Sequence, residues 1–198
     1  MVKATSFVSE IAASLLARAY QPKAILMYVP AETYLASILG GPNSRQEARV
    51  LAPLRLRRLQ KRLGGGTWTL SALSEGELIA MSWASEMTAL AEAAKTAGPR
   101  VQWSDFNSLL ANPAQSLKSA FLHLGIEATD AEARKITDGD EMRRYSKAPE
   151  HAYDAKLRRD VLNQAREQFA AEIGWGLNWL ERGADEFPLL REVMDGRR

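Results

Sequence analysis

The chain has 198 residues, of which 46% are hydrophobic and 25% are charged, a composition typical of a folded globular protein. Its 26 lysines and arginines barely exceed its 24 acidic residues, so a net charge of +2 gives no overall case for nucleic-acid binding. The absence of cysteine excludes disulfides, thiolate metal sites and cysteine nucleophiles. No apolar run reaches the roughly 18 residues that span a bilayer, and the N-terminal segment lacks signal-peptide character. We therefore expect a cytoplasmic protein without a membrane partner.

Short strands alternate with helices in the first part of the chain. Residues 1–4 and the apolar run 23–29 are predicted strands, and apolar residues at helical spacing predict a helix over 6–20 between them. Pro30 ends the second strand, and the pattern over 31–39 predicts a helix that ends at Gly40 and Gly41. A strand that runs directly into a helix is the usual frame of a nucleotide site, because the helix N-terminus attracts phosphate.

Helices dominate the remainder of the sequence. A third strand is predicted at 101–103, and one long helix over 155–182 follows a segment, 139–153, that looks irregular. No linker divides the chain, so the alternation predicts a single α/β domain over 1–198, with a small parallel sheet covered by many helices. Three capping-box patterns predict further helix starts: Ser44 with Glu47, Ser74 with Glu77, and Thr129 with Glu132.

Two clusters in the middle of the chain, one of glycines and one of basic residues, each allow a structural and a functional interpretation. The glycines at 64–66 lead into Thr67 and Trp68 rather than the Lys-Ser or Lys-Thr of a Walker loop, so we interpret them as a helix stop. The basic run 55–62 carries leucines at helical spacing, which would turn its arginines to solvent. A solvated helix face and a nucleic-acid surface both fit this run, but no known motif supports the second, and nucleic acid is not an expected partner.

Cations also gather in the segment 141–159. Arg143, Arg144 and Lys147 fall in a predicted loop before the C-terminal helix, which suits a multi-phosphate anion as well as an ordinary charged surface. His123 lies among apolar residues and is interpreted as a core or half-exposed residue. An unperturbed histidine has a pKa near neutrality, which suits proton transfer, but the sequence places no partner beside His151. Two distant histidines without cysteine predict no metal site.

The order of these segments resembles that of PAPS-dependent sulfotransferases. The stretch "ILMYVPAETYLASIL" (25–39) is similar in outline to the family's strand, R-x-P turn and serine-bearing helix. The stretch "VQWSDFNSLLANPAQSLKSAFLHLGI" (101–126) resembles the family's later strand, turn and helix, and "YSKAPEHAYDAKLRRDVL" (145–162) looks like the C-terminal loop and helix of bacterial members. The likeness covers about residues 3–180 and implies a partial P-loop-like sulfotransferase fold.

The resemblance also implies roles for particular residues, with PAPS as the sulfuryl donor and an unknown acceptor. Tyr28 stands where the family has arginine, and Ala36 where it has serine. The family's phosphosulfate loop would precede residue 1, and its catalytic histidine has no counterpart near residues 3–6. By resemblance, Lys3 would stand near the transferred group, Ser37 and Arg45 would touch the 3′-phosphate, and Arg143, Arg144 and Lys147 would close over the nucleotide.

Two interpretations of function follow. One is a sulfotransferase-like domain that transfers a sulfuryl group from PAPS if a complete site can form, although the chain alone should bind adenosine 3′,5′-bisphosphate weakly or not at all. The other is a non-catalytic, degenerate sulfotransferase-like or helical interaction domain. Trp175 and Trp179 are four residues apart and should share a helix face beside Gly174 and Gly176. We expect the chain to self-associate through this face or through a bare sheet edge.

Overall fold

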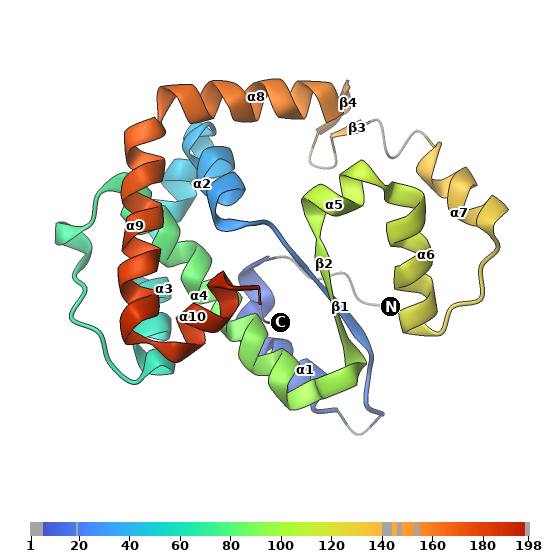
Figure 1. Ribbon diagram of the computed structural model, residues 1–198, viewed down its shortest axis with the longest axis horizontal. Coiled ribbons are helices and arrows are strands. Elements are labelled where there is room, and N and C mark those ends of the chain that lie inside the picture. Colours follow the sequence, from blue (N-terminus) through green and yellow to red (C-terminus); the bar gives the residue numbers. More distant parts are fainter. Residues whose placement is uncertain (1–5, 19, 140–143, 146–147, 153–154, 197–198) are drawn as a thin grey trace.

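The computed structural model describes residues 6–18, 20–139, 144–145, 148–152 and 155–196. A small sheet lies among many helices (Figure 1), which confirms the helix-dominated α/β fold in outline. The elements in chain order are η1 (Ser6–Ile11), α1 (Ala12–Leu16), β1 (Ala24–Tyr28), α2 (Ala31–Leu39), α3 (Pro42–Leu63), η2 (Leu70–Ala72), α4 (Glu75–Ala97), η3 (Gly98–Arg100), β2 (Val101–Asp105), α5 (Phe106–Ala111), α6 (Pro113–Leu124), α7 (Asp130–Thr137), β3 (Arg144–Tyr145), β4 (Ala148–Ala152), α8 (Ala155–Gln168), α9 (Ala170–Glu186) and α10 (Pro188–Met194).

The two central strands, β1 and β2, pair in parallel, from Ala24 opposite Val101 to Tyr28 opposite Asp105. The predicted strands at 23–29 and 101–103 are therefore confirmed, and the second extends two residues further. The strand predicted at 1–4 lies outside the described residues. β3 and β4 pair antiparallel within the segment that was expected to be irregular. That expectation was wrong for these residues, because a strand pairing depends on its partner as well as on local pattern.

Helix α4 is the centre of the packing. Residues 79–85 are all buried, so every side of this helix faces other parts of the protein, among them α3, α9, α1 and α10. The predicted capping box is present at its start: the Glu77 amide donates to the Ser74 hydroxyl, and the Ser74 amide donates to the Glu77 carboxylate. The box at Thr129 and Glu132 is confirmed in the same way at the start of α7.

Glycines allow α4 and α9 to cross closely. A Cβ atom on Gly76 would overlap the backbone carbonyl of Glu172, and one on Gly176 would lie 2.7 Å from the carbonyl oxygen of Gly76. The Gly76 amide also donates to the Glu172 carboxylate at 2.6 Å. Close packing beside Trp175 is thus confirmed at Gly176, with α4 of the same chain as the partner. Gly174 has open space around it.

Helix α3 begins earlier than predicted. Gly41 precedes it and Pro42 is its first residue, a position that proline favours, whereas the predicted Ser44–Glu47 box does not start the helix. Pro53 lies inside α3 without ending it. The helix ends at Gly64, which adopts a left-handed conformation with φ of 75°, as the helix-stop interpretation requires.

The basic run on α3 is not a uniformly solvated face, so the prediction that its arginines all face water was wrong. Arg55 is 6% exposed, and its Nε donates to Glu86 at 3.1 Å. Arg62 donates from Nε to Glu92 and from one terminal nitrogen to the Ser85 carbonyl, each at 3.0 Å. Acidic and carbonyl groups on α4 therefore draw both guanidinium groups inward, which weakens the case for a nucleic-acid surface here.

The predicted long C-terminal helix is divided at Phe169 into α8 and α9. The break lets α8 pass over α2 while α9 turns and runs along α4 (Figure 1). Trp179 is 2% exposed and its ring lies 4.8 Å from that of Trp68, whereas Trp175 is 51% exposed. The expectation that the two tryptophans share one exposed face was therefore wrong. Self-association stays a prediction, through the exposed Trp175 or through an edge of the small sheet.

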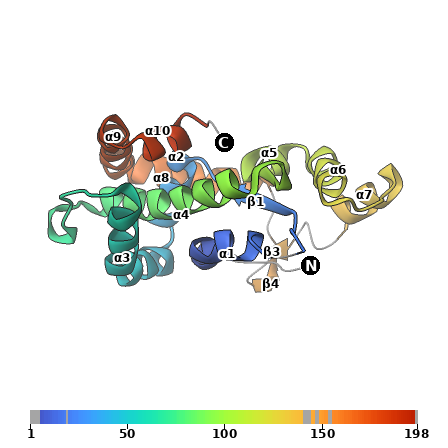
Figure 2. The same cartoon turned by 90° about the horizontal axis from the view of Figure 1, so that it is seen from below.

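The segment from α5 to α7 forms a lobe beyond the sheet, on the side away from the helices that surround α4 (Figure 2). Neither α5 nor α6 contains a buried residue, and α7 contains one, Ala133. His123 of α6 is half-buried, as predicted, with Nε2 3.1 Å from the carbonyl oxygens of Ala24 and Arg100. Polar contacts to the sheet therefore matter more to this lobe than a core of its own.

No helix in the described part of the chain combines the length and the apolar character needed to cross a membrane.

Candidate functional site at the carboxyl edge of the sheet

The carboxyl ends of β1 and β2 meet at one edge of the sheet. Tyr28 and Asp105 are the last paired residues, α2 begins three residues after Tyr28, and α5 follows β2 directly. Ligands of parallel α/β sheets bind outside the carboxyl ends of the strands, where loops and helix N-termini converge. This edge is therefore the first place to look for a site, and we call the five polar residues Glu32, Thr33, Asn107, Arg158 and Arg166 the carboxyl-edge cluster.

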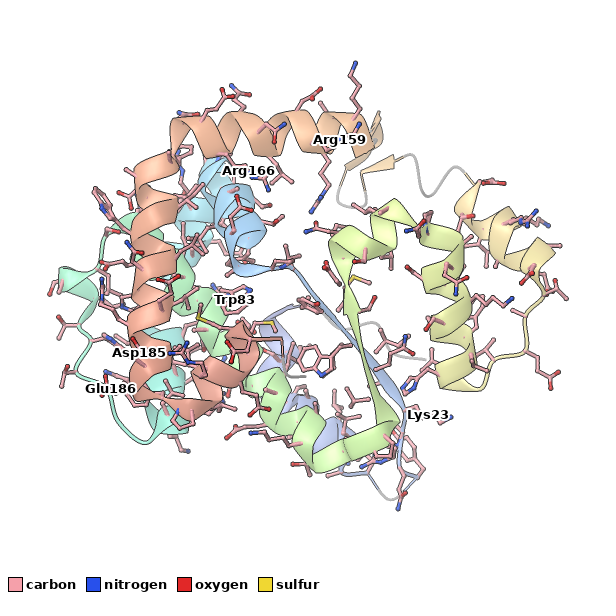
Figure 3. All side chains as sticks on the ribbon, viewed as in Figure 1. Lys23, Trp83, Arg159, Arg166, Asp185 and Glu186 are labelled. Carbon is pink, nitrogen blue, oxygen red and sulfur yellow. The ribbon has the colours of Figure 1, made fainter. Side chains whose placement is uncertain are left out.

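An ion pair joins the start of α2 to α8. Arg166 points from α8 toward α2 (Figure 3), donating from Nε to Glu32 Oε1 at 2.6 Å and from a terminal nitrogen to Oε2 at 2.9 Å. Hydrogen bonds from Arg166 lower the pKa of Glu32 despite partial burial, and the same bonds raise the pKa of Arg166. Pro30 offers no side-chain cap to α2, so the positive end of this helix faces the edge beside the pair.

The second half of the cluster joins three separate elements. Asn107 of α5 donates from Nδ2 to the hydroxyl of Thr33 on α2 at 3.4 Å. A terminal nitrogen of Arg158 on α8 donates to Asn107 Oδ1 at 2.9 Å, and its guanidinium group lies 5.2 Å from the centre of the Phe106 ring. Thr33 is 6% exposed and donates in turn to Glu32 at 3.3 Å. The cluster is thus continuous from Arg166 to Arg158.

Aromatic side chains and a cap position the edge itself. The rings of Tyr28 and Trp103 meet edge-on, 6.0 Å apart at 78°, on one face of the sheet. The indole nitrogen of Trp83 (Figure 3) donates to the carbonyl of Val29 at 2.9 Å, which fixes the chain where it leaves β1. Asp105 caps α5 by accepting the Asn107 amide at 2.8 Å. The Trp83 hydrogen bond and the Asp105 cap therefore fix the backbone just after the ends of β1 and β2.

Ser37 and Arg45, which the sequence analysis assigned to the 3′-phosphate, do not belong to the carboxyl-edge cluster. Ser37 is exposed on α2, two turns from its start. Arg45 lies near the other end of α2, which is about 13 Å long, with its guanidinium 5.3 Å from the Phe169 ring and 3.6 Å from Glu75. Its Nε is buried without a hydrogen-bond partner in the described part of the chain. The structure therefore does not bring Arg45 into the carboxyl-edge cluster.

Other predicted positions are only partly described. Lys3, Arg143 and Lys147 lie outside the described residues. The backbone of Arg144 belongs to β3 and that of His151 to β4, without a description of their side chains.

The sequence analysis did not single out Thr33, Asn107 or Arg158 as site residues. One signal was present: in "SDFN", an aspartate follows a predicted strand two residues before an asparagine, the pattern of a capped turn. Arg158 was counted among the cations of the basic segment but not assigned a role. Its contact with Asn107 spans 51 positions, which no local pattern encodes.

The edge carries two guanidinium groups and one carboxylate, Glu32, and its donors are engaged with partners inside the carboxyl-edge cluster. Guanidinium, amide and hydroxyl donors converge beside a helix N-terminus, and such groups bind phosphate or sulfate oxygens. The neighbouring Tyr34 does not supply a base at neutral pH, because burial raises its pKa to about 12. No group of three or more potential metal-binding side chains occurs within the described ranges.

No protein-family model, curated protein or solved structure matches this chain. The resemblance to sulfotransferases therefore remains a prediction from the sequence.

Proposed function

We propose that the chain is a sulfotransferase-like domain that holds the adenosine 3′,5′-bisphosphate part of PAPS at the carboxyl edge of β1 and β2. One observation carries the proposal: two parallel strands end in register at this edge, and Arg158 reaches it from α8. The order of strand, helix, second strand and basic C-terminal helix is also the order on which the family resemblance rests. A nucleotide anion suits the donors of the carboxyl-edge cluster.

The transfer itself would be a displacement at sulfur. An acceptor oxygen or nitrogen attacks the sulfur of PAPS, the bond from sulfur to the phosphate oxygen breaks, and adenosine 3′,5′-bisphosphate leaves while a base takes the acceptor's proton. Cations and N–H groups stabilise the charge on the sulfuryl oxygens and the leaving group. Arg158 and the first turn of α2 are proposed for this role at the nucleotide.

The resemblance supplies the remaining proposed contacts. Lys3 is proposed beside the transferred group, and Arg143, Arg144 and Lys147 over the nucleotide. Ser37 and Arg45 are proposed for the 3′-phosphate, and Arg45 would first have to exchange Glu75 for that phosphate.

A non-catalytic interaction domain is the second candidate, and one observation favours it. Thr33, Asn107 and Arg158 already satisfy one another with hydrogen bonds. These hydrogen bonds connect α5 to α2 and to α8, and they need no ligand to do so. Under this alternative, Arg158 contributes to the stability of the fold and to no binding reaction.

Calorimetric titration of the full chain with adenosine 3′,5′-bisphosphate separates the two candidates. We expect weak binding, with a dissociation constant above about 1 μM, and at least a tenfold loss in Arg158→Ala. Arg159→Ala is the matched control, because Arg159 is the next residue of α8 and is exposed. No binding at millimolar nucleotide, or binding that Arg158→Ala leaves unchanged, would favour the non-catalytic domain.

A further inference from the structure

Residues 6–16, which form η1 and α1, pack on α4 as an N-terminal arm. Figure 2 shows α1 on the other side of α4 from α10. Among the side chains described for the arm, Ala12 and Leu16 are buried in a small cluster with two alanines of α4, apart from the main core. Three of the four buried members of this cluster are alanines, so it buries little apolar surface and stabilises the arm weakly.

A buried arginine of α3 receives a carboxylate from the arm. Arg62 donates from one terminal nitrogen to the carboxylate of Glu10, and its side chain is 7% exposed. Three groups of α4 fix Arg62 without help from the arm: the carboxylate of Glu92, the carbonyl of Ser85 and the hydroxyl of Thr88, at 3.0 to 3.1 Å. The surface that receives Glu10 therefore belongs to α3 and α4 alone.

The turn between the arm and β1 is strained at Gln21. Its φ of 47° lies in the left-handed region, the one positive value at a residue other than glycine in the described part of the chain. Pro22 follows, and a residue before proline favours an extended conformation with negative φ. Arg100 holds the turn closed by donating to the carbonyls of Leu16 and Pro22, at 2.7 and 3.3 Å. An extended Gln21 would release the strain and move the arm away from its own α4.

We propose that two copies of this chain exchange their arms, so that each arm packs on α4 of the other copy. The exchanged dimer keeps the contacts of the closed monomer, including that of Glu10 with Arg62, because both copies carry the same receiving surface. It also replaces two strained turns by two extended connections. The loss of translational freedom on association opposes this gain, so the dimer forms as the protein concentration rises. The exchange needs neither the nucleotide site nor Trp175.

Two variants of the turn shift the exchange in opposite directions, measured by sedimentation velocity over a range of concentrations. Gln21→Gly accepts a positive φ and should weaken dimerisation about thirtyfold, because two turns change in each dimer. Gln21→Pro excludes a positive φ and removes the hydrogen bond from this amide to the Arg18 carbonyl, so it should strengthen dimerisation by at least the same factor. Thr69→Gly is the matched control, at an exposed loop residue that is already extended.

Charge reversal identifies the surface that the arm occupies. Glu10→Arg and Arg62→Glu each bring like charges together in a closed monomer or in a dimer of one variant. A mixed dimer of the two variants pairs opposite charges at both arms, so it should form at least tenfold more tightly than either variant forms with itself. Native mass spectrometry resolves the three dimers by mass. The double variant restores the pair within one chain and is the control, which should behave as the wild type.

The outcomes that would overturn the exchange are distinct. Equal dimerisation constants for Gln21→Gly and Gln21→Pro, or monomers alone in both at the highest soluble concentration, would do so even where Arg62→Glu fails to fold. A mixed dimer no tighter than the dimers of folded single variants would do so as well. Loss of the dimer in Trp175→Gln, with no response to the turn variants, would assign self-association to the exposed tryptophan instead.

Discussion

Seven consecutive residues of α4, 79–85, are buried, whereas α5 and α6 contain no buried residue and α7 contains one. The helices around α4 are therefore stabilised by apolar burial and close packing. The α5–α7 lobe depends on its connection to β2 and on directed polar contacts such as those of Asn107 and His123. The carboxyl-edge cluster lies where these two regions meet, so a ligand there would contact both the closely packed helices and the lobe.

We expect the largest loss of stability from a substitution at the crossing of α4 and α9. Gly76→Ala places a methyl group against the backbone of Glu172, which cannot move without shifting α9. We expect a loss of about 4 kcal/mol in the free energy of unfolding, measured by urea denaturation. Gly174→Ala is the matched control: it has open space and should stabilise the helix by about 0.5–1 kcal/mol. Equal effects at the two glycines would contradict the close crossing.

Leucine truncations compare the two regions directly. Leu59 of α3 is fully buried, so Leu59→Ala should cost about 3 kcal/mol through lost burial and the cavity that remains. Leu122 of α6 is 82% exposed, and Leu122→Ala should change stability by about 0.5 kcal/mol or less. Urea denaturation of both variants is the measurement. A cost at Leu122 that approaches the cost at Leu59 would show that the lobe is covered by something in solution.

The junction is tested by Asn107→Ala, which removes the contacts to both Thr33 and Arg158. The global free energy of unfolding should fall by about 1–2 kcal/mol. Native-state hydrogen exchange should accelerate in α5–α7 before it does so in α4, because the lobe can open without the rest. Exchange that accelerates equally in α4 and α6 would mean that the two regions unfold as one unit.

The smallest expected effect is the pH dependence of the Glu32–Arg166 pair. The folded pKa of Glu32 is lowered, so its contribution is fully present above the ordinary value of 4.5 and is lost as the pH falls through the lowered pKa. Both side chains are more than a third exposed, so the pair contributes less than about 1 kcal/mol. Glu32→Gln should reduce the difference in stability between pH 6 and pH 3, measured by urea denaturation. Glu181→Gln, at an exposed carboxylate of α9, should not.

Local signals in the sequence predicted the local structure well. Ser74 and Thr129 cap helices as their three-residue spacing to glutamate predicts, and Gly64 ends α3 in the conformation that glycine favours. The strands at 24–28 and 101–105 follow from short apolar or aromatic runs bounded by turns. Each of these signals lies within a short stretch of sequence, although the pairing of the two strands joins residues 77 positions apart (101 − 24).

Features that depend on distant partners were missed. Arg55 turns inward because Glu86, 31 positions away, lies opposite it on α4. The C-terminal helix breaks at Phe169, where α9 turns toward the distant helix α4, although the apolar spacing continues through the break. The contact of Asn107 with Thr33 spans 74 positions. Helical periodicity shows which face is apolar, but not which charged group on another helix will meet it.

The register of the parallel sheet has a consequence for how the chain folds. Ala24 pairs with Val101 and Tyr28 with Asp105, so every rung joins residues 77 positions apart (101 − 24 and 105 − 28). Closing so long a loop is entropically costly until α2, α3 and α4 have shortened the distance between the strands. The sheet should therefore form late, after the local helical contacts, and give the protein a higher contact order than its helical content suggests. The carboxyl edge would then be among the last parts of the molecule to be assembled.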